Sequence, residues 1–134
     1  LNINNDILIV RFDAQLYFAN VSFFKDKLDE FVTEKGSQLK LIIIDGESIN
    51  SIDSSGIFML KDVMNKYKNM GIEIAFSGMK GPVRDILDKS EIIKKIDYSN
   101  CFMSIQEAVD VFDDRKKNKE IEVKYFDFIN QTNS

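Results

Sequence analysis

The tetrapeptide Asp53-Ser54-Ser55-Gly56 is the stretch of this chain with the clearest chemical potential. It directly precedes apolar residues at helical spacing, so it should lie at the amino end of a helix, where backbone N–H groups are unpaired and the helix dipole is positive. Negative charge is favoured there, which predicts either a phosphoacceptor at Ser54 or a docking point for a phosphate-bearing ligand. The alternative is plain helix capping, for which Asp and Ser are preferred residues.

A second candidate is the glycine-containing stretch Ser77–Pro82, in which Gly78, Lys80 and Gly81 could contact a phosphate. It lacks the glycine and lysine spacing of a P-loop, so a tight strand-to-helix turn is the better interpretation.

Three carboxylates near these stretches, Asp45, Asp53 and Asp62, could suggest a metal site. Asp62 falls more than two helical turns beyond Ser54, and a loop of unknown path separates the other two. We therefore interpret them as solvated carboxylates and expect neither a metal nor another cofactor.

The composition excludes several classes of chemistry. The 134 residues contain no histidine and a single cysteine, which rules out a Ser-His-Asp triad, a Cys-His pair and a disulfide framework within the chain. A net charge of −4 argues against a nucleic-acid partner. No apolar run is long enough to span a bilayer. Because the chain begins at Leu1 without a methionine, we expect it to be a piece of a longer protein.

The elements that would position the tetrapeptide are a strand and a helix. Leu41 to Ile44 are four consecutive apolar residues, which predicts a strand covered on both faces, as in a parallel sheet flanked by helices. Apolar residues from Ile57 to Tyr67 recur at helical spacing, and Ile72 to Phe76 read as a second strand. This β-α-β order places the tetrapeptide at the carboxyl edge of the sheet, where open α/β sheets usually bind ligands.

The remaining elements complete a β-β-α-β-α-β-α-β-α order. We predict an α/β domain with a mixed sheet of about five strands and four helices packed mainly on one side. The other expected elements are strands at Ile7–Phe12, Gln15–Phe18 and Asn100–Phe102, and helices after Asn20, at Pro82 and at the capping box Ser104–Glu107.

The chain changes character after Asp113, where a charged run leads into a segment with alternating apolar residues. We expect a domain over residues 1–115 and a tail over residues 116–134, which is either mobile or packed back on the domain or on a neighbour. Lys116, Lys117 and Lys119 could face anionic lipid, although a solvated charge run is the default. Phe18 and Phe23 do not fit the apolar stripes, so we expect them on an exposed contact surface.

Three stretches together resemble the STAS domain, specifically the cytoplasmic carboxyl-terminal STAS domain of SulP-type anion transporters such as sulfate permeases. They are Phe12–Asn20, Ile52–Gly56 and Gly78–Leu87, and the similarity covers about residues 7–112. The Asp-Ser-Ser-Gly turn is shared with the family's other branch, the bacterial anti-sigma-factor antagonists. The stretch Leu16 to Asn20 instead looks like the transporter form.

The resemblance implies a non-catalytic regulatory and interaction domain on the cytoplasmic side of the cell membrane, within an integral membrane protein. Its expected partners are the transmembrane domain of the same polypeptide, a cytosolic protein or a nucleotide, and a second copy in a homodimer. Asp53, Ser54, Ser55, Gly56, Gly78, Lys80 and Gly81 would be the place for such contacts. The alternative is a stand-alone anti-sigma-factor antagonist switched by phosphorylation of Ser54.

Overall fold

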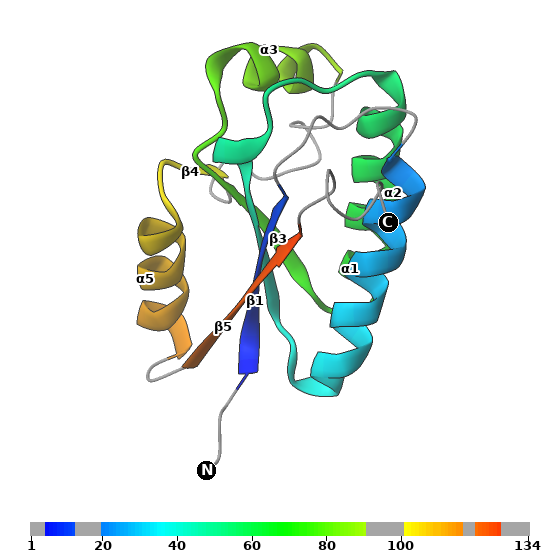
Figure 1. The fold of residues 1–134 in the computed structure, drawn as a ribbon. Coiled ribbons are helices and arrows are strands. Elements are labelled where there is room, and N and C mark those ends of the chain that lie inside the picture. The colour runs from blue at the N-terminus through cyan, green and yellow to red at the C-terminus, as the bar shows by residue number, and fades with distance from the viewer. Residues whose placement is uncertain (1–4, 13–19, 91–100, 117–119, 127–134) are drawn as a thin grey trace.

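The protein, seen here as a computed structural model, is a parallel sheet with helices on both faces (Figure 1). The structure describes residues 5–12, 20–90, 101–116 and 120–126. Its strands are β1 (Asn5–Phe12), β2 (Leu41–Asp45), β3 (Glu73–Ser77), β4 (Cys101–Phe102) and β5 (Glu120–Phe126). Its α-helices are α1 (Val21–Lys35), α2 (Ser54–Asn69), α3 (Gly81–Lys89) and α5 (Ile105–Lys116), and two short 3₁₀ turns are η1 (Gly36–Gln38) and η2 (Gly46–Ser48).

The sheet has the strand order β4-β3-β2-β1-β5, with β2 in the middle. All four pairings are parallel, and Ile9 lies beside Ile43, which lies beside Ala75. The expected α/β fold with about five strands is therefore confirmed. Within the described residues its sheet is parallel and not mixed, because helical crossovers return the chain to the same edge before each of these strands begins. The extra strand expected at Gln15–Phe18 lies outside the described residues.

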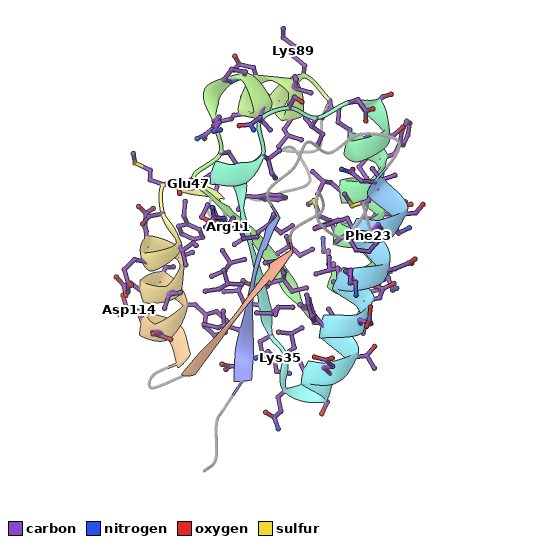
Figure 2. All side chains as sticks on the ribbon, viewed as in Figure 1. Arg11, Phe23, Lys35, Glu47, Lys89 and Asp114 are labelled. Carbon is purple, nitrogen blue, oxygen red and sulfur yellow. The ribbon has the colours of Figure 1, made fainter. Side chains whose placement is uncertain are left out.

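The central position of β2 explains its unbroken apolar run. All five of its residues are buried, and its four aliphatic side chains alternate between two core clusters. Ile42 and Ile44 belong to the larger cluster under α1 and α2, whereas Leu41 and Ile43 belong to the smaller one under α5. Figure 2 shows side chains filling the space on both sides of the sheet. The prediction of a strand covered on both faces is confirmed.

The helices begin and end where local sequence signals predict. Gly36 closes α1 with a φ of 71°, a conformation that glycine adopts without a steric penalty. Ser104 caps α5, because its Oγ accepts a hydrogen bond from the Glu107 amide at 3.1 Å. Asn20 occupies the N-cap position of α1, but its side chain makes no capping hydrogen bond. The helices lie mainly on one side, since α3 contributes Val83 and Leu87 to the same cluster as α1 and α2.

Part of the expected tail belongs to the sheet. Glu120–Phe126 forms β5, which pairs along β1 from Asn5 to Phe12. This supports the alternative in which the segment packs back on the domain. The alternating apolar residues of this segment are typical of a strand, but they do not indicate which edge of the sheet the strand joins.

Candidate functional site

The tetrapeptide Asp53–Gly56 starts α2 at the carboxyl edge of the sheet. Asp53 is the N-cap residue, in an extended conformation, and its Oδ1 accepts a hydrogen bond from the Gly56 amide at 2.9 Å. Ser54, the first residue of the helix, is exposed, whereas Gly56 is buried. The capping interpretation is thus confirmed, and Asp53 is the capping residue.

Because Asp53 is the cap, the Ser54 hydroxyl is not needed for that purpose. Within the described part of the chain, no hydrogen bond engages this hydroxyl. It projects at a helix amino end where the dipole favours added negative charge. Capping and phosphate acceptance, treated as alternatives in the sequence, are therefore compatible at neighbouring residues.

The loop that leads into the tetrapeptide is firmly held. Ile49 and Ile52 are 1% and 6% exposed and join the main core cluster. At the start of the loop, the Asp45 Oδ1 accepts a hydrogen bond from the Glu47 amide at 3.1 Å. The turn before α2 is consequently anchored at both ends, and Ser54 is presented from a fixed backbone.

The Gly78–Gly81 stretch is a strand-to-helix turn, as predicted. Gly78 has a φ of 62°, which favours glycine, and Lys80 occupies the N-cap position of α3 without a capping hydrogen bond from its side chain. The Lys80 ammonium instead donates a hydrogen bond to the Asn50 side chain, in the loop before α2. The structure therefore brings the two candidate stretches to the same edge and ties them through Asn50.

The hydrogen bond between Lys80 and Asn50 does not involve Ser54 or Ser55. Over residues 5–12, 20–90, 101–116 and 120–126, no hydrogen bond or ion pair joins Lys80 to Ser54 or Ser55. The candidate residues form two adjacent groups that are joined through Asn50.

The three carboxylates considered for a metal site have separate surroundings. Asp45 is buried and accepts the Glu47 amide, and Asp53 caps α2. Asp62 pairs with Lys25 of α1 at 3.6 Å. The residues described here contain no group of three or more acidic, cysteine or histidine side chains suited to a metal ion.

Phe58 is a further candidate contact residue, which the sequence analysis missed. It lies one helical turn after Ser54, its relative exposure is 67%, and Lys61 places its ammonium 5.8 Å from the ring centroid. Phe58 also falls outside the apolar stripe of its helix, and that break in spacing was the available signal. An exposed aromatic beside a helix amino end is a natural anchor for a protein contact.

Of the two phenylalanines expected on a contact surface, Phe23 lies within the described residues. Phe23 is half-buried and packs against the main core cluster, so that expectation is wrong. Lys27 lies 5.7 Å from its ring centroid. Phe18 lies outside the described residues.

Cys101 is a half-buried free thiol on β4. Burial raises its pKa, with Arg84 opposing and Asp88 adding to the effect. Since the thiolate is the reactive form, this cysteine is a poor nucleophile near neutral pH.

Comparisons with known proteins identify the family of this chain. A family model for the STAS domain matches residues 1–108. The chain belongs to the STAS domain family. A probable sulfate transporter 4.2 from Arabidopsis thaliana is 35% identical over 116 residues, covering 80% of this chain but 17% of the relative. This STAS chain thus spans less than a fifth of that relative's length.

Two solved structures share the fold. The murine Slc26a9 anion transporter in the inward-facing state matches with a TM-score of 0.73 and 23% identity, covering 80% of this chain and 18% of that one. The STAS domain of a SulP transporter from Vibrio cholerae matches with a TM-score of 0.68 and 17% identity, covering 87% and 89% of the two chains. At these identities the likeness establishes the STAS fold. Within the described residues, no helix combines the length and apolar character needed to cross a bilayer.

Proposed function

We propose that this STAS domain is a non-catalytic regulatory and interaction module on the cytoplasmic side of a SulP-type anion transporter. The aligned segment covers 17% and 19% of two relatives named as sulfate transporters, which supports a domain within a larger membrane protein. Its first partner is then the transmembrane domain of the same polypeptide. A cytosolic protein, a nucleotide and a second copy of the chain are further candidate partners.

The observation that supports this proposal is that Asp53 and Ser54 have different roles at the start of α2. Asp53 supplies the cap, and Ser54 stands exposed at the positive end of α2. A partner that contacts this turn meets a fixed backbone, the Ser54 hydroxyl and, one turn further, the exposed ring of Phe58. A phosphate on Ser54 would place about two negative charges at the edge of that contact. New or lost charge-assisted hydrogen bonds would then shift the contact by about 1 to 3 kcal/mol.

The experiment measures anion uptake by the full-length transporter carrying a substitution at Ser54 or at Phe58. We expect Ser54→Glu and Phe58→Ala to alter uptake at equal surface expression, because both change the proposed contact. Ser22→Glu is the matched control, since Ser22 is also exposed in the first turn of a helix, α1. Uptake that is unchanged by both Ser54→Glu and Phe58→Ala would contradict a regulatory role for this turn.

The phosphoacceptor role of Ser54 needs its own measurement. The domain is incubated with lysate and ATP, and its intact mass is recorded together with that of Ser54→Ala. We expect one added phosphate that is lost in the Ala variant. If no phosphate is added and uptake by full-length Ser54→Ala is normal, the phosphoswitch is excluded and the contact role is tested by Phe58→Ala alone.

The stand-alone antagonist is distinguished by the gene upstream of Leu1. Several apolar segments of about 20 residues there would support the transporter, since each is long enough to span a bilayer. A start codon next to Leu1 would support the antagonist.

A further inference from the structure

The loops that follow β2 and β3 pack on each other reciprocally. Gly46 directly follows β2, and a Cβ there would overlap the side chain of Met79 and lie 3.0 Å from the Ser77 carbonyl oxygen. Gly78 directly follows β3, and a Cβ there would lie 2.6 Å from Cγ of Glu47. Each loop therefore seats a side chain of the other against a glycine. Figure 2 shows Glu47 at this edge of the sheet.

A hydrogen bond joins the same two loops further along the chain. Asn50 accepts a hydrogen bond from the Lys80 ammonium. Asn50 lies four residues before Ser54, and Lys80 lies one residue before the start of α3 at Gly81. The loop that presents Ser54 and the loop that begins α3 consequently share three contacts, so a displacement of one loop is expected to perturb the other.

The two helices attached to these loops are held with different strength. α2 has 16 residues, five of them buried, and Asp53 caps it. α3 has nine residues, of which Val83 and Leu87 are buried, and no side chain caps its amino end. Since burial and capping both resist displacement, a change at the shared loops should move the first turn of α3 more than that of α2.

We infer that this loop pair couples the Ser54 turn to α3, with Asn50 as the positioning residue. Negative charge or a bound partner at Ser54 changes the first turn of α3, whose exposed Arg84 and Asp85 then present a different surface. Because coupling between sites is reciprocal, a partner on α3 changes affinity at the Ser54 turn by the same factor. The inference rests on the proposed function for its input at Ser54, whereas the loop contacts do not depend on it.

The test records backbone amide spectra of the ¹⁵N-labelled 134-residue chain with and without Ser54→Glu. We expect the charge to shift amide signals of Gly78, Gly81 and Arg84, beyond the neighbours of Ser54. In an Asn50→Leu background, which removes the acceptor without changing the net charge, these remote shifts should fall by about half or more. An Asn50→Asp background keeps an acceptor for Lys80 and should restore them.

Two controls separate coupling from other effects. Ser22→Glu adds the same charge to α1 and should leave the Gly78–Arg84 signals unchanged. Dispersed spectra for every variant establish that it is folded, so that loss of the shifts in Asn50→Leu is not unfolding. An effect of charge acting through space would survive in Asn50→Leu, because Lys80 keeps its ammonium there.

The inference is overturned if Ser54→Glu shifts only residues around the α2 turn, or if the remote shifts persist in Asn50→Leu. Its failure is distinguishable from failure of the proposed function. Remote shifts together with normal anion uptake would support the coupling and reject the regulatory role. Altered uptake without remote shifts would support the regulatory role and reject the coupling.

Discussion

The layer of α1 and α2 and the layer of α5 cover opposite faces of one sheet, but different interactions hold them. The first layer shares a large cluster of buried side chains and is cross-linked by polar contacts, in which Asp29 of α1 accepts from Tyr67 and pairs with Lys66 of α2 at 2.9 Å. The second layer buries a smaller cluster.

Charge also differs between the two layers. On α1 and α2, Lys25 faces Asp62 and Lys27 faces Glu30. On α5, the acidic residues Glu107, Asp110, Asp113 and Asp114 are followed by Arg115 and Lys116 at the carboxyl end of the helix. The candidate site begins on the cross-linked layer. The exposed residues proposed to contact a partner therefore begin on the layer with the larger buried cluster.

The largest expected effect on stability comes from removing one phenylalanine ring from each layer. Phe24 of α1 is fully buried in the larger cluster, and Phe112 of α5 is 5% exposed and lines a small hollow beside Phe102. We expect Phe24→Ala to lower the free energy of unfolding by about 3 to 5 kcal/mol and Phe112→Ala by less, because the second site retains access to solvent. Urea denaturation of both variants measures this. An equal or larger loss for Phe112→Ala would contradict the comparison.

The next test removes the carboxylate that links α1 to α2. Asp29→Ala leaves the hydroxyl of Tyr67, a residue that is 1% exposed, without its acceptor, so we expect a loss of about 1 to 3 kcal/mol in unfolding free energy. Glu30→Ala is the control, because Glu30 makes only a surface pair with Lys27 and should cost at most about 0.5 kcal/mol. Similar losses in the two variants would mean that the cross-link does not stabilise this layer.

The same carboxylate predicts a pH dependence. Burial opposes ionisation of Asp29, but hydrogen bonds from Tyr67 and Lys66 and the charges of Lys66 and Lys25 outweigh it, so its pKa lies below the ordinary value of 3.8. Since the folded pKa is the lower one, this contribution is fully present above pH 3.8 and is lost as pH falls through the folded value. The Asp29→Ala deficit should therefore shrink in acid. A deficit that is constant down to pH 2 would contradict the assignment.

Smaller effects are expected from the two helix caps, one in each layer. Asp53 accepts from the Gly56 amide at 2.9 Å, and Ser104 accepts from the Glu107 amide at 3.1 Å. We expect Asp53→Ala to cost about 1 to 2 kcal/mol and Ser104→Ala about 0.5 to 1 kcal/mol, because a charged acceptor also interacts with the helix dipole. Thermal denaturation compares them, with Ser54→Ala as the neutral neighbour. A loss in Ser54→Ala as large as in Asp53→Ala would show that the serine is the cap.

Local signals in the sequence predicted the elements of the first layer. The apolar run in β2, the helical spacing in α2, the cap at Asp53 and the stop at Gly36 each depend on residues close together in the chain. The family resemblance, carried by three short stretches, added the fold. What these signals could not give is the pairing of β5 with β1, since the partners are more than 100 residues apart and register depends on non-local packing.

The candidate site was predicted in part for the same reason. That Ser54 begins a helix follows from its neighbours, but its exposure depends on Asp53 taking the cap. The contact of Lys80 with Asn50 joins loops 30 residues apart, and no spacing rule foretells it. Phe58 departs from the helical stripe, and periodicity alone does not distinguish an exposed contact residue from an ordinary surface residue.

The smallest predicted effect lies on α5. Burial, and then the charges of Asp110, Asp6 and Asp114, raise the pKa of Asp113 above its ordinary value of 3.8. The sign is therefore opposite to that of Asp29: ionised Asp113 disfavours the folded state, and the penalty disappears as pH falls below 3.8. We expect Asp113→Asn to raise the free energy of unfolding by about 0.2 to 0.5 kcal/mol at neutral pH, with no gain at pH 3. Asp26→Asn, at an exposed position on α1, is the control because its charge is not among those that raise the Asp113 pKa. Destabilisation by Asp113→Asn at neutral pH would show that its charge supports this layer, and the contrast between the two faces would then be one of packing alone.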